Sequence, residues 1–399
     1  MTRHLNNGNM NHSGQIELAL RKFVAPEFIF GIDAIRLTGR YARNLGASRV
    51  LLATDAGVMA AGWTQLVMQS LDDDGIQFEL FSAISPNPRA TEVMAGAEFF
   101  ITHHCNAIVA VGGGSVMDCA KGIGIVATNG GHILDYKGVD KVAIPMPPLI
   151  CTPTTGGTAA DVSQFAIINN ENERVKIAII SKAVVPDVAL IDPATLTTMD
   201  AHLTACTGID ALVHAIEAFV SNASSTITDL HAGEAIQLIH QHLINAIAHP
   251  NDLTLRGQIM MGSLYAGLAF SNASLGCVHA MAHSLGGYLD LPHGECNAML
   301  LPHVMEYNFT ASPQRFAKIG EYMGLDIKGL PPLQQKKAIV NHVQAFKHQA
   351  GITQTLSSRG VQSSDIPLLA AKAINDPCNI TNPRKPTQSD LATIYQEAM

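Results

Sequence analysis

Residues 107–115 read AIVAVGGGS, an apolar run that passes directly into a glycine-rich turn. The first five residues suit a buried β-strand, and residues 116–128 have the length and apolar spacing of a helix. A strand, a tight turn and a helix in succession are typical of the repeating unit of a parallel sheet. This stretch therefore predicts an α/β domain around it.

Four further apolar runs have the length of strands and are separated by segments of helical length. They are residues 49–54, 77–81, 149–152 and 188–192, with residues 91–104 among the helical segments. Near-continuous apolar strands separated by helices favour a parallel sheet with both faces covered. We expect a polar, disordered tail over residues 1–15 and a doubly wound, dinucleotide-binding α/β domain over residues 16–193.

Beyond residue 193 the β-rich runs stop, and long stretches rich in Ala, Leu, His and Gln follow at helical spacing. We expect helices over residues 204–221, 228–248, 253–270 and 333–350. The second half, residues 194–399, is therefore predicted to be an all-α domain.

Composition excludes several classes of protein. The formal net charge is −8 and no run of Lys and Arg stands out, which argues against nucleic-acid binding. No segment reaches the roughly 18 apolar residues of a membrane span, and the N-terminus lacks the apolar core of a signal peptide. We expect a cytoplasmic protein without membrane partners, and the charged fraction of only 15% hints at a homo-oligomer.

The seven cysteines form no CxxC pair and are odd in number. This pattern indicates neither a disulfide framework nor a cysteine-ligated zinc site. We expect reduced thiols.

The glycine turn after residues 107–111 is a candidate phosphate site. Backbone N–H groups and the positive end of a helix dipole lie at such a turn, and glycine lets a phosphate approach closely. A plain turn explains the same residues, and the run is not the GxGxxG fingerprint.

Two other strand ends strengthen the nucleotide interpretation. Asp55 follows the strand at residues 49–54, where a carboxylate can accept both ribose hydroxyls and repel a 2′-phosphate. The run CTPTTGGTAAD, residues 151–161, adds hydroxyl groups after another strand. Capping of the next helix is an equally good explanation of Asp55.

Histidines and one aspartate recur at helical spacing in the second half. Asp210 and His214 lie four residues apart in TACTGIDALVHAIEAF, as do His279 and His283 in HAMAHSLGGYLDLPHG, which ends with His293 and Gly294. A single buried histidine is more often a core residue than a ligand. Three imidazoles and one carboxylate together suit a divalent transition metal, and that set would be Asp210, His214, His279 and His293.

Four motifs in this order resemble the iron-dependent (group III) alcohol dehydrogenase family. They are VGGGSVMDCAKGIG (111–124), PTTGGTAADVS (153–163), TGIDALVHAIEAFVS (207–221) and VHAMAHSLGGYLDLPHGECNAMLLPHV (278–304). The resemblance runs from about residue 24 to the C-terminus. The segment NITNPRKPT (379–387) looks most like the branch of 1,3-propanediol, methanol and short-chain alcohol dehydrogenases.

The resemblance implies a dehydroquinate synthase-like architecture, with a Rossmann-like α/β domain for NAD and a helical domain for the metal. It implies Fe²⁺, or Zn²⁺, as the metal, with Asp210, His214, His279 and His293 as its ligands. Implied NAD contacts are Asp55, Gly113, Gly114, Ser115, Thr154, Thr155, Thr158 and Lys176. His283 is placed beside the nicotinamide and the substrate, either as a proton relay or as part of the pocket lining.

The expected reaction is reversible hydride transfer between NAD and a short-chain primary alcohol or aldehyde. Alternatives are a glycerol-dehydrogenase-like zinc polyol dehydrogenase, a dehydroquinate-synthase-like enzyme, and a non-catalytic NAD-binding protein. Candidate pocket residues are Phe165, Phe270 and Cys277. One departure weakens the expected cofactor contacts: where most members have a GTGSE-like run, this chain has GTAAD, residues 157–161.

Overall fold

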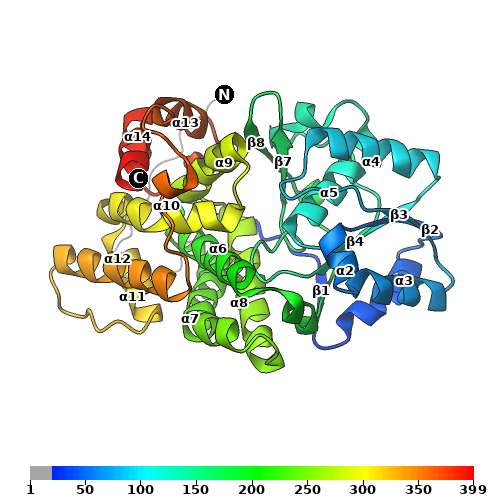
Figure 1. Ribbon diagram of the computed structural model, residues 1–399, viewed down its shortest axis with the longest axis horizontal. Helices are drawn as coiled ribbons and strands as arrows, with labels where there is room; N and C mark the ends of the chain where they lie inside the picture. The colour runs from blue at the N-terminus through cyan, green and yellow to red at the C-terminus, as the bar shows by residue number, and fades with distance from the viewer. Residues whose placement is uncertain (1–19) are drawn as a thin grey trace.

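The structure is a computed structural model that describes residues 20–399. The expected tail over residues 1–15 lies outside the described residues. Figure 1 shows an α/β part beside a helical part. Among the described residues every strand lies between Glu27 and Ile191, and the chain beyond is helical or irregular. This confirms the expected fold class, while the exact boundary between residues 193 and 194 stays a prediction.

The main sheet has six strands, all parallel, in the order β1-β9-β6-β4-β2-β3. Their bounds are β1 Glu27–Phe30, β2 Arg49–Ala53, β3 Gln77–Phe81, β4 Ala107–Gly112, β6 Leu149–Pro153 and β9 Val188–Ile191. The five strands expected from apolar runs are present. The edge strand β1 was missed because it is only four residues long and largely exposed.

Helices cover both faces of this sheet. Alternate residues of a strand point to opposite faces, so Leu51 and Ile108 pack under α4 (Ala90–Thr102) and α5 (Gly114–Asn129). Val50 and Val109 point the other way. They pack with residues of α1 (Thr38–Asn44) and α3 (Trp63–Asp73), beside the short α2 (Ala56–Ala60).

A second, three-stranded sheet connects the two parts of the molecule. It consists of β5 (Gly138–Val139), β8 (Val175–Ile180) and β7 (Phe165–Asn170), with β7 and β8 antiparallel. A Cβ on Gly287 of α9 (Cys277–Leu289) would lie 2.5 Å from the Val175 Cα. Only glycine therefore allows α9 to approach β8 so closely, and no pattern in the sequence indicated this contact.

The helical part is built around α6 (Ala201–Val220). The other helices are α7 Thr226–Ala248, α8 Leu253–Ala273, α9, α10 His293–Asn308, α11 Pro313–Tyr322, α12 Pro332–Gln349, α13 Ile366–Ala373 and α14 Gln388–Glu397. Among the described residues α6 alone is long and apolar enough to cross a membrane, yet 94% of its most apolar window is buried inside the protein. Its apolar character is that of a core helix.

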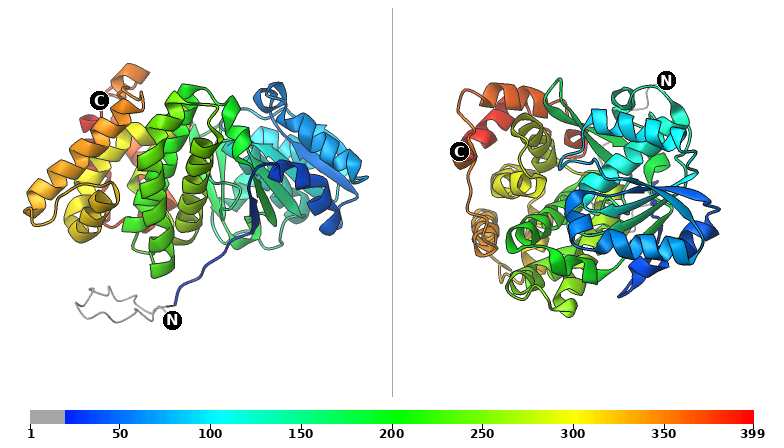
Figure 2. Two further views of the ribbon diagram at one scale, coloured as in Figure 1. Left: turned by 90° about the horizontal axis from the view of Figure 1, so that it is seen from below. Right: turned by 45° about the vertical axis from the view of Figure 1, so that its right-hand side comes forward.

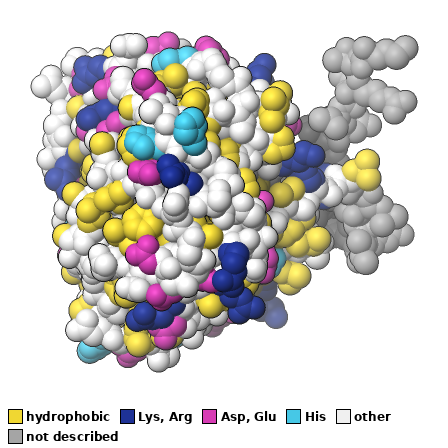
Figure 3. Space-filling view, turned by 90° about the vertical axis from the view of Figure 1, so that its right-hand side faces the viewer, with side chains coloured by type: hydrophobic (Ala, Val, Ile, Leu, Met, Phe, Trp, Pro, Cys, Tyr) yellow, Lys and Arg dark blue, Asp and Glu magenta, His cyan; other side chains and the backbone are white. Residues whose placement is uncertain are grey.

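The described N-terminal residues run as an extended arm from the sheet toward the helical part (Figure 2). The backbone N–H of Val24 in this arm donates to Asn272 Oδ1 at 2.7 Å, and Asn272 Nδ2 donates to the Val24 carbonyl oxygen at 3.0 Å. On the face drawn in Figure 3, Lys and Arg side chains are dispersed among Asp and Glu.

Candidate active site

One face of α6 supplies a row of buried polar side chains. Asp210, His214 and Glu217 follow at i, i+4 and i+7, and each is at most 4% exposed. This spacing places them along one side of a helix. Glu217 was missed from the sequence, although its place in this row was a readable signal.

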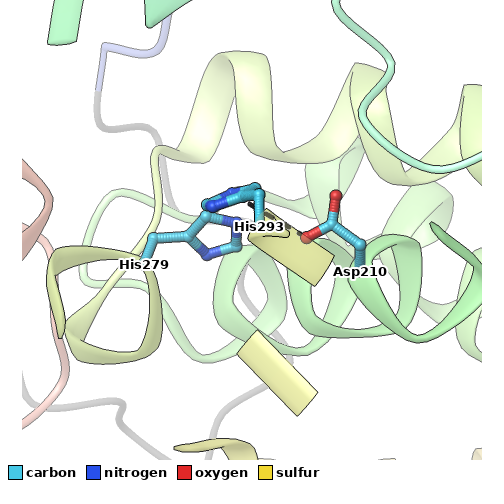
Figure 4. A group of neighbouring side chains, drawn as sticks. All are labelled: Asp210, His279 and His293. Carbon is cyan, nitrogen blue, oxygen red and sulfur yellow. Dashed lines mark ion pairs between the residues drawn. The ribbon is translucent and has the colours of Figure 1, made fainter. Parts of the chain in front are cut away.

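Three of the predicted ligands converge. Asp210 of α6, His279 of α9 and His293 at the start of α10 present ligand atoms that all lie within 4.8 Å of one another. Figure 4 shows the two imidazole rings and the carboxylate turned toward a common point, with Asp210 Oδ1 and His293 Nε2 3.9 Å apart. We call these residues the three-ligand cluster. Two imidazoles and a carboxylate in this arrangement fit a divalent transition metal.

A buried carboxylate fixes the orientation of His279. Its Nδ1 lies 2.6 Å from Glu217 Oε2, and the Glu217 oxygens also accept hydrogen bonds from Gly276 N and Val278 N. Nδ1 therefore donates, which leaves the Nε2 lone pair for the interior of the cluster. Burial raises the pKa of Glu217 to about 7, and the backbone N–H groups oppose that rise. Such carboxylate–histidine pairs orient metal ligands in many sites.

His214 lies against the cluster without belonging to it. Its Nδ1 donates to Gly157 O at 3.2 Å, since a carbonyl can only accept. Its ring stacks on His279 at 4.5 Å and on Phe270 at 4.3 Å. The role of His214 as a fourth ligand stays a prediction.

Burial lowers the pKa of His214, His279 and His293. These imidazoles are therefore neutral at pH 7, and a neutral ring keeps the lone pair that a metal needs.

His283 has a carboxylate partner of its own. Its Nδ1 lies 2.8 Å from Asp376 Oδ2, and Asp376 Oδ1 accepts the Cys378 N–H. Burial alone would raise the pKa of Asp376, but the interaction with His283 lowers it below its ordinary value. The His283 ring stacks against His293 at 5.4 Å. Asp376 was missed, because it lies 93 residues away along the chain and no local pattern marks it.

The predicted phosphate loop abuts the threonine loop. Gly113 caps α5, and a Cβ on it would lie 3.1 Å from the Thr155 side chain. A Cβ on Gly114 would lie 2.8 Å from Thr158. Glycine is thus needed here for the contact of two loops, and Thr154 N donates to Gly112 O at 2.9 Å.

Asp55 has a local structural role. It caps α2, where its Oδ1 accepts from Val58 N at 2.9 Å. The capping alternative considered from the sequence is therefore present, and ribose binding by Asp55 stays a prediction.

Lys176 lies on β8 and donates from Nζ to Asn87 Oδ1 at 2.6 Å. Burial lowers the pKa of its ammonium group. Near it, burial raises the pKa of Asp118 to about 7, against the opposing effect of Lys121. Asp118 was not among the site residues predicted from the sequence.

A pocket between the two parts of the molecule collects many of these side chains. Of the predicted site residues it is lined by Gly114, Ser115, Thr158, Lys176, His214, His279, His283 and His293, together with Asn87, Asp118, Phe165, Phe270 and Leu275. Among the described residues its wall does not include Asp55, Gly113, Thr154, Thr155, Asp210 or Cys277.

The GTAAD run, which departs from the GTGSE-like run of most family members, contains a residue with an unusual backbone conformation. Ala159 adopts φ +46°, a left-handed conformation in which glycine is less strained. Asp161, two residues further along the chain, is 5% exposed, and burial raises the pKa of this carboxyl to about 6.

Comparison with known proteins agrees with this geometry. Residues 25–193 match the family model described as iron-containing alcohol dehydrogenase, and residues 204–399 match that of the Fe-containing alcohol dehydrogenase family, C-terminal. The 1,3-propanediol dehydrogenase of Citrobacter freundii is 41% identical over 92% of this chain and 96% of its own length. The NAD-dependent methanol dehydrogenase of Bacillus methanolicus is 36% identical over 94% and 99%, respectively.

A crystal structure of 1,3-propanediol oxidoreductase aligns with a TM-score of 0.92 at 40% identity, covering 96% of this chain and 100% of that one. The resemblance first seen in four short motifs thus extends over both halves of the sequence and over the whole fold. The chain belongs to the iron-containing alcohol dehydrogenase family.

Proposed function

We propose that this protein transfers a hydride reversibly between NAD(H) and a short-chain primary alcohol or aldehyde. The supporting observation is the convergence of Asp210, His279 and His293 beside a pocket that Gly114 and Ser115 also line. The names of two relatives, a 1,3-propanediol and an NAD-dependent methanol dehydrogenase, favour small alcohols as substrates.

Four side chains would hold the metal in this proposal: Asp210, His214, His279 and His293. Bound there, Fe²⁺ or Zn²⁺ supplies Lewis acidity to an alcohol or carbonyl oxygen. The chain supplies neutral imidazoles and, through Glu217, a fixed tautomer of His279.

The nucleotide would lie along the two loops that abut. Gly113, Gly114 and Ser115 offer backbone N–H groups at the start of α5, where a pyrophosphate is favoured. Thr154, Thr155 and Thr158 on the facing loop, together with Lys176 and Asp55, complete the proposed contacts. The carboxylate of Asp55 favours NAD over NADP, because it repels a 2′-phosphate.

His283 is proposed to carry the alcohol proton. Asp376 accepts the hydrogen bond from its Nδ1, which leaves Nε2 as the group able to take up or release a proton. Phe165, Phe270 and Leu275 give the same pocket an apolar part. A small substrate with an apolar carbon chain fits this lining.

NADH oxidation tests the proposal. The protein is stripped with a chelator, then supplied anaerobically with Fe²⁺ or Zn²⁺, with propanal or 3-hydroxypropanal as substrate. We expect no rate in the stripped protein and restoration by Fe²⁺. Full activity without metal contradicts the metal-dependent mechanism.

Parallel assays address the alternatives. Restoration by Zn²⁺ with a preference for glycerol in the oxidative direction indicates the polyol dehydrogenase instead. NAD binding without turnover of any alcohol or aldehyde indicates the non-catalytic protein. The cytoplasmic location and the homo-oligomeric state expected from the sequence stay predictions.

A further inference from the structure

Asn297 lies at the centre of the three-ligand cluster, although it is not one of the expected ligands. It follows His293 by one turn of α10 and is fully buried. Its Nδ2 lies 2.6 Å from Asp210 Oδ1, 3.2 Å from His279 Nε2 and 3.2 Å from His293 Nε2. One amide nitrogen thus contacts all three ligand atoms.

The chemistry of these contacts fixes which way the amide faces. An NH₂ group donates two hydrogens, and two of its three neighbours present lone pairs: the Asp210 carboxylate oxygen, and His279 Nε2, since Glu217 holds the hydrogen of that ring on Nδ1. Turning the amide over would place Oδ1 against these two acceptors. In the observed orientation Asn297 Oδ1 is buried and accepts no hydrogen bond from the described residues. The two hydrogens of the amide can therefore satisfy two of the three ligand atoms at a time, and its own oxygen is left without a partner.

A hydrogen bond and a metal bond to the same imidazole nitrogen exclude each other. A neutral imidazole has one acceptor lone pair, at the nitrogen without hydrogen. Glu217 holds the hydrogen of His279 on Nδ1. The lone pair of His279 Nε2 can therefore bind either the Asn297 N–H or a cation, but not both.

We propose that Asn297 competes with the metal for its ligands. The amide keeps Asp210, His279 and His293 in position in the metal-free protein, and it must turn aside when a cation binds. Asn297 therefore stabilises the metal-free form and lowers the affinity for the metal. This inference rests on the metal site of the proposed function.

The test compares metal affinity with the stability of the metal-free protein. The full chain carrying Asn297→Ala is stripped with a chelator, and its dissociation constant for Fe²⁺ is measured anaerobically by competition with a chromogenic chelator. We expect about tenfold tighter binding than in the wild type, because hydrogen bonds are lost from the metal-free form alone. The melting temperature of the metal-free variant should fall, and that of the loaded variant should change much less.

Asn308→Ala is the matched control. Asn308 is a buried asparagine of the same helix, and its amide pairs with Asn382 at 2.8 and 2.9 Å. Its replacement should destabilise the metal-free and loaded forms alike and leave the dissociation constant unchanged. Asn297→Ser has a side chain too short to reach all three ligand atoms. It should shift the affinity in the same direction as Ala, and it replaces the Ala variant in the test if that variant does not fold.

Two results overturn the inference while leaving the proposed function intact. Weaker binding in Asn297→Ala means that Asn297 supports the bound metal, and unchanged binding means that its contacts are purely structural. If the wild-type protein shows no saturable binding of Fe²⁺ or Zn²⁺, both the metal site and the role of Asn297 are wrong.

Discussion

The helical part contains two groups of histidines that differ in how their nitrogens are used. Around the three-ligand cluster, the Nδ1 atoms of His214, His279 and His283 are bound to a carbonyl or a carboxylate. Between α7 and α12, His240 and His342 bind each other, with their Nε2 atoms 2.7 Å apart. In the first group external partners free the second nitrogen for chemistry. In the second group the Nε2 atom of each ring is occupied by the hydrogen bond to the other ring.

The largest expected effect, that of replacing Asp210, tests the difference between the two groups of histidines directly. Asp210→Asn removes a charged ligand but keeps the side-chain shape. Since a metal contributes several kcal/mol to such reactions, turnover should fall about a thousandfold or more. Metal content and kcat are the measurements. The control, His342→Gln, should keep metal content and kcat near wild-type values. A comparable loss in this variant would show that the two groups of histidines do not differ in function.

Glu217→Gln tests the external partner of His279. The amide is isosteric with the carboxylate but a weaker acceptor for the Nδ1–H. Metal affinity should fall roughly ten- to a hundredfold, as is usual when such a partner is changed. Chelator competition gives the value. An unchanged affinity would show that the hydrogen bond at 2.6 Å does not tune the site.

Asp376→Asn tests the partner of His283 and should have a smaller effect. The variant weakens the interaction that orients the ring, so kcat should fall about tenfold, below the loss expected for a direct acid–base group. Metal content should be unchanged, which distinguishes this variant from Glu217→Gln. Loss of metal would instead make His283 part of the ligand set.

The smallest effect concerns the pair outside the site. Burial lowers the pKa of His240 to about 4, with a further contribution from His342. The unfolded chain takes up this proton near pH 6.5, so the unfolded state binds more protons between pH 6.5 and 4. The free energy of unfolding should therefore decline as the pH falls through this window. Partial exposure of the ring limits the effect to no more than about 1 kcal/mol.

His240→Gln removes this titration. Urea unfolding of the variant and the wild type at pH 7 and pH 5 should show a smaller decline in the variant. Parallel declines in the two proteins would mean that His240 gains its proton as easily in the folded state as in the unfolded chain.

Local patterns predicted some of the site residues that share one element. The spacing of Asp210 and His214 indicated one helix face, and the glycine turn after β4 indicated a loop at the start of a helix. The partners Glu217, Asp376 and Asn297 were not predicted. For Asp376 the reason is distance along the chain. For Asn297 it is that an asparagine one turn after a histidine has no distinctive pattern.

The amino-acid sequence by itself determined the two-part architecture, because alternation of apolar strands with helices, followed by helical spacing alone, leaves few ways to bury the apolar surface. It also determined which residue types were available for a metal. Tertiary packing decided how they are used: α6, α9 and α10 bring Asp210, His279 and His293 together, and only their crossing places His279 Nδ1 against Glu217. The direction of a lone pair depends on contacts between distant segments, and no local pattern in a sequence contains that information.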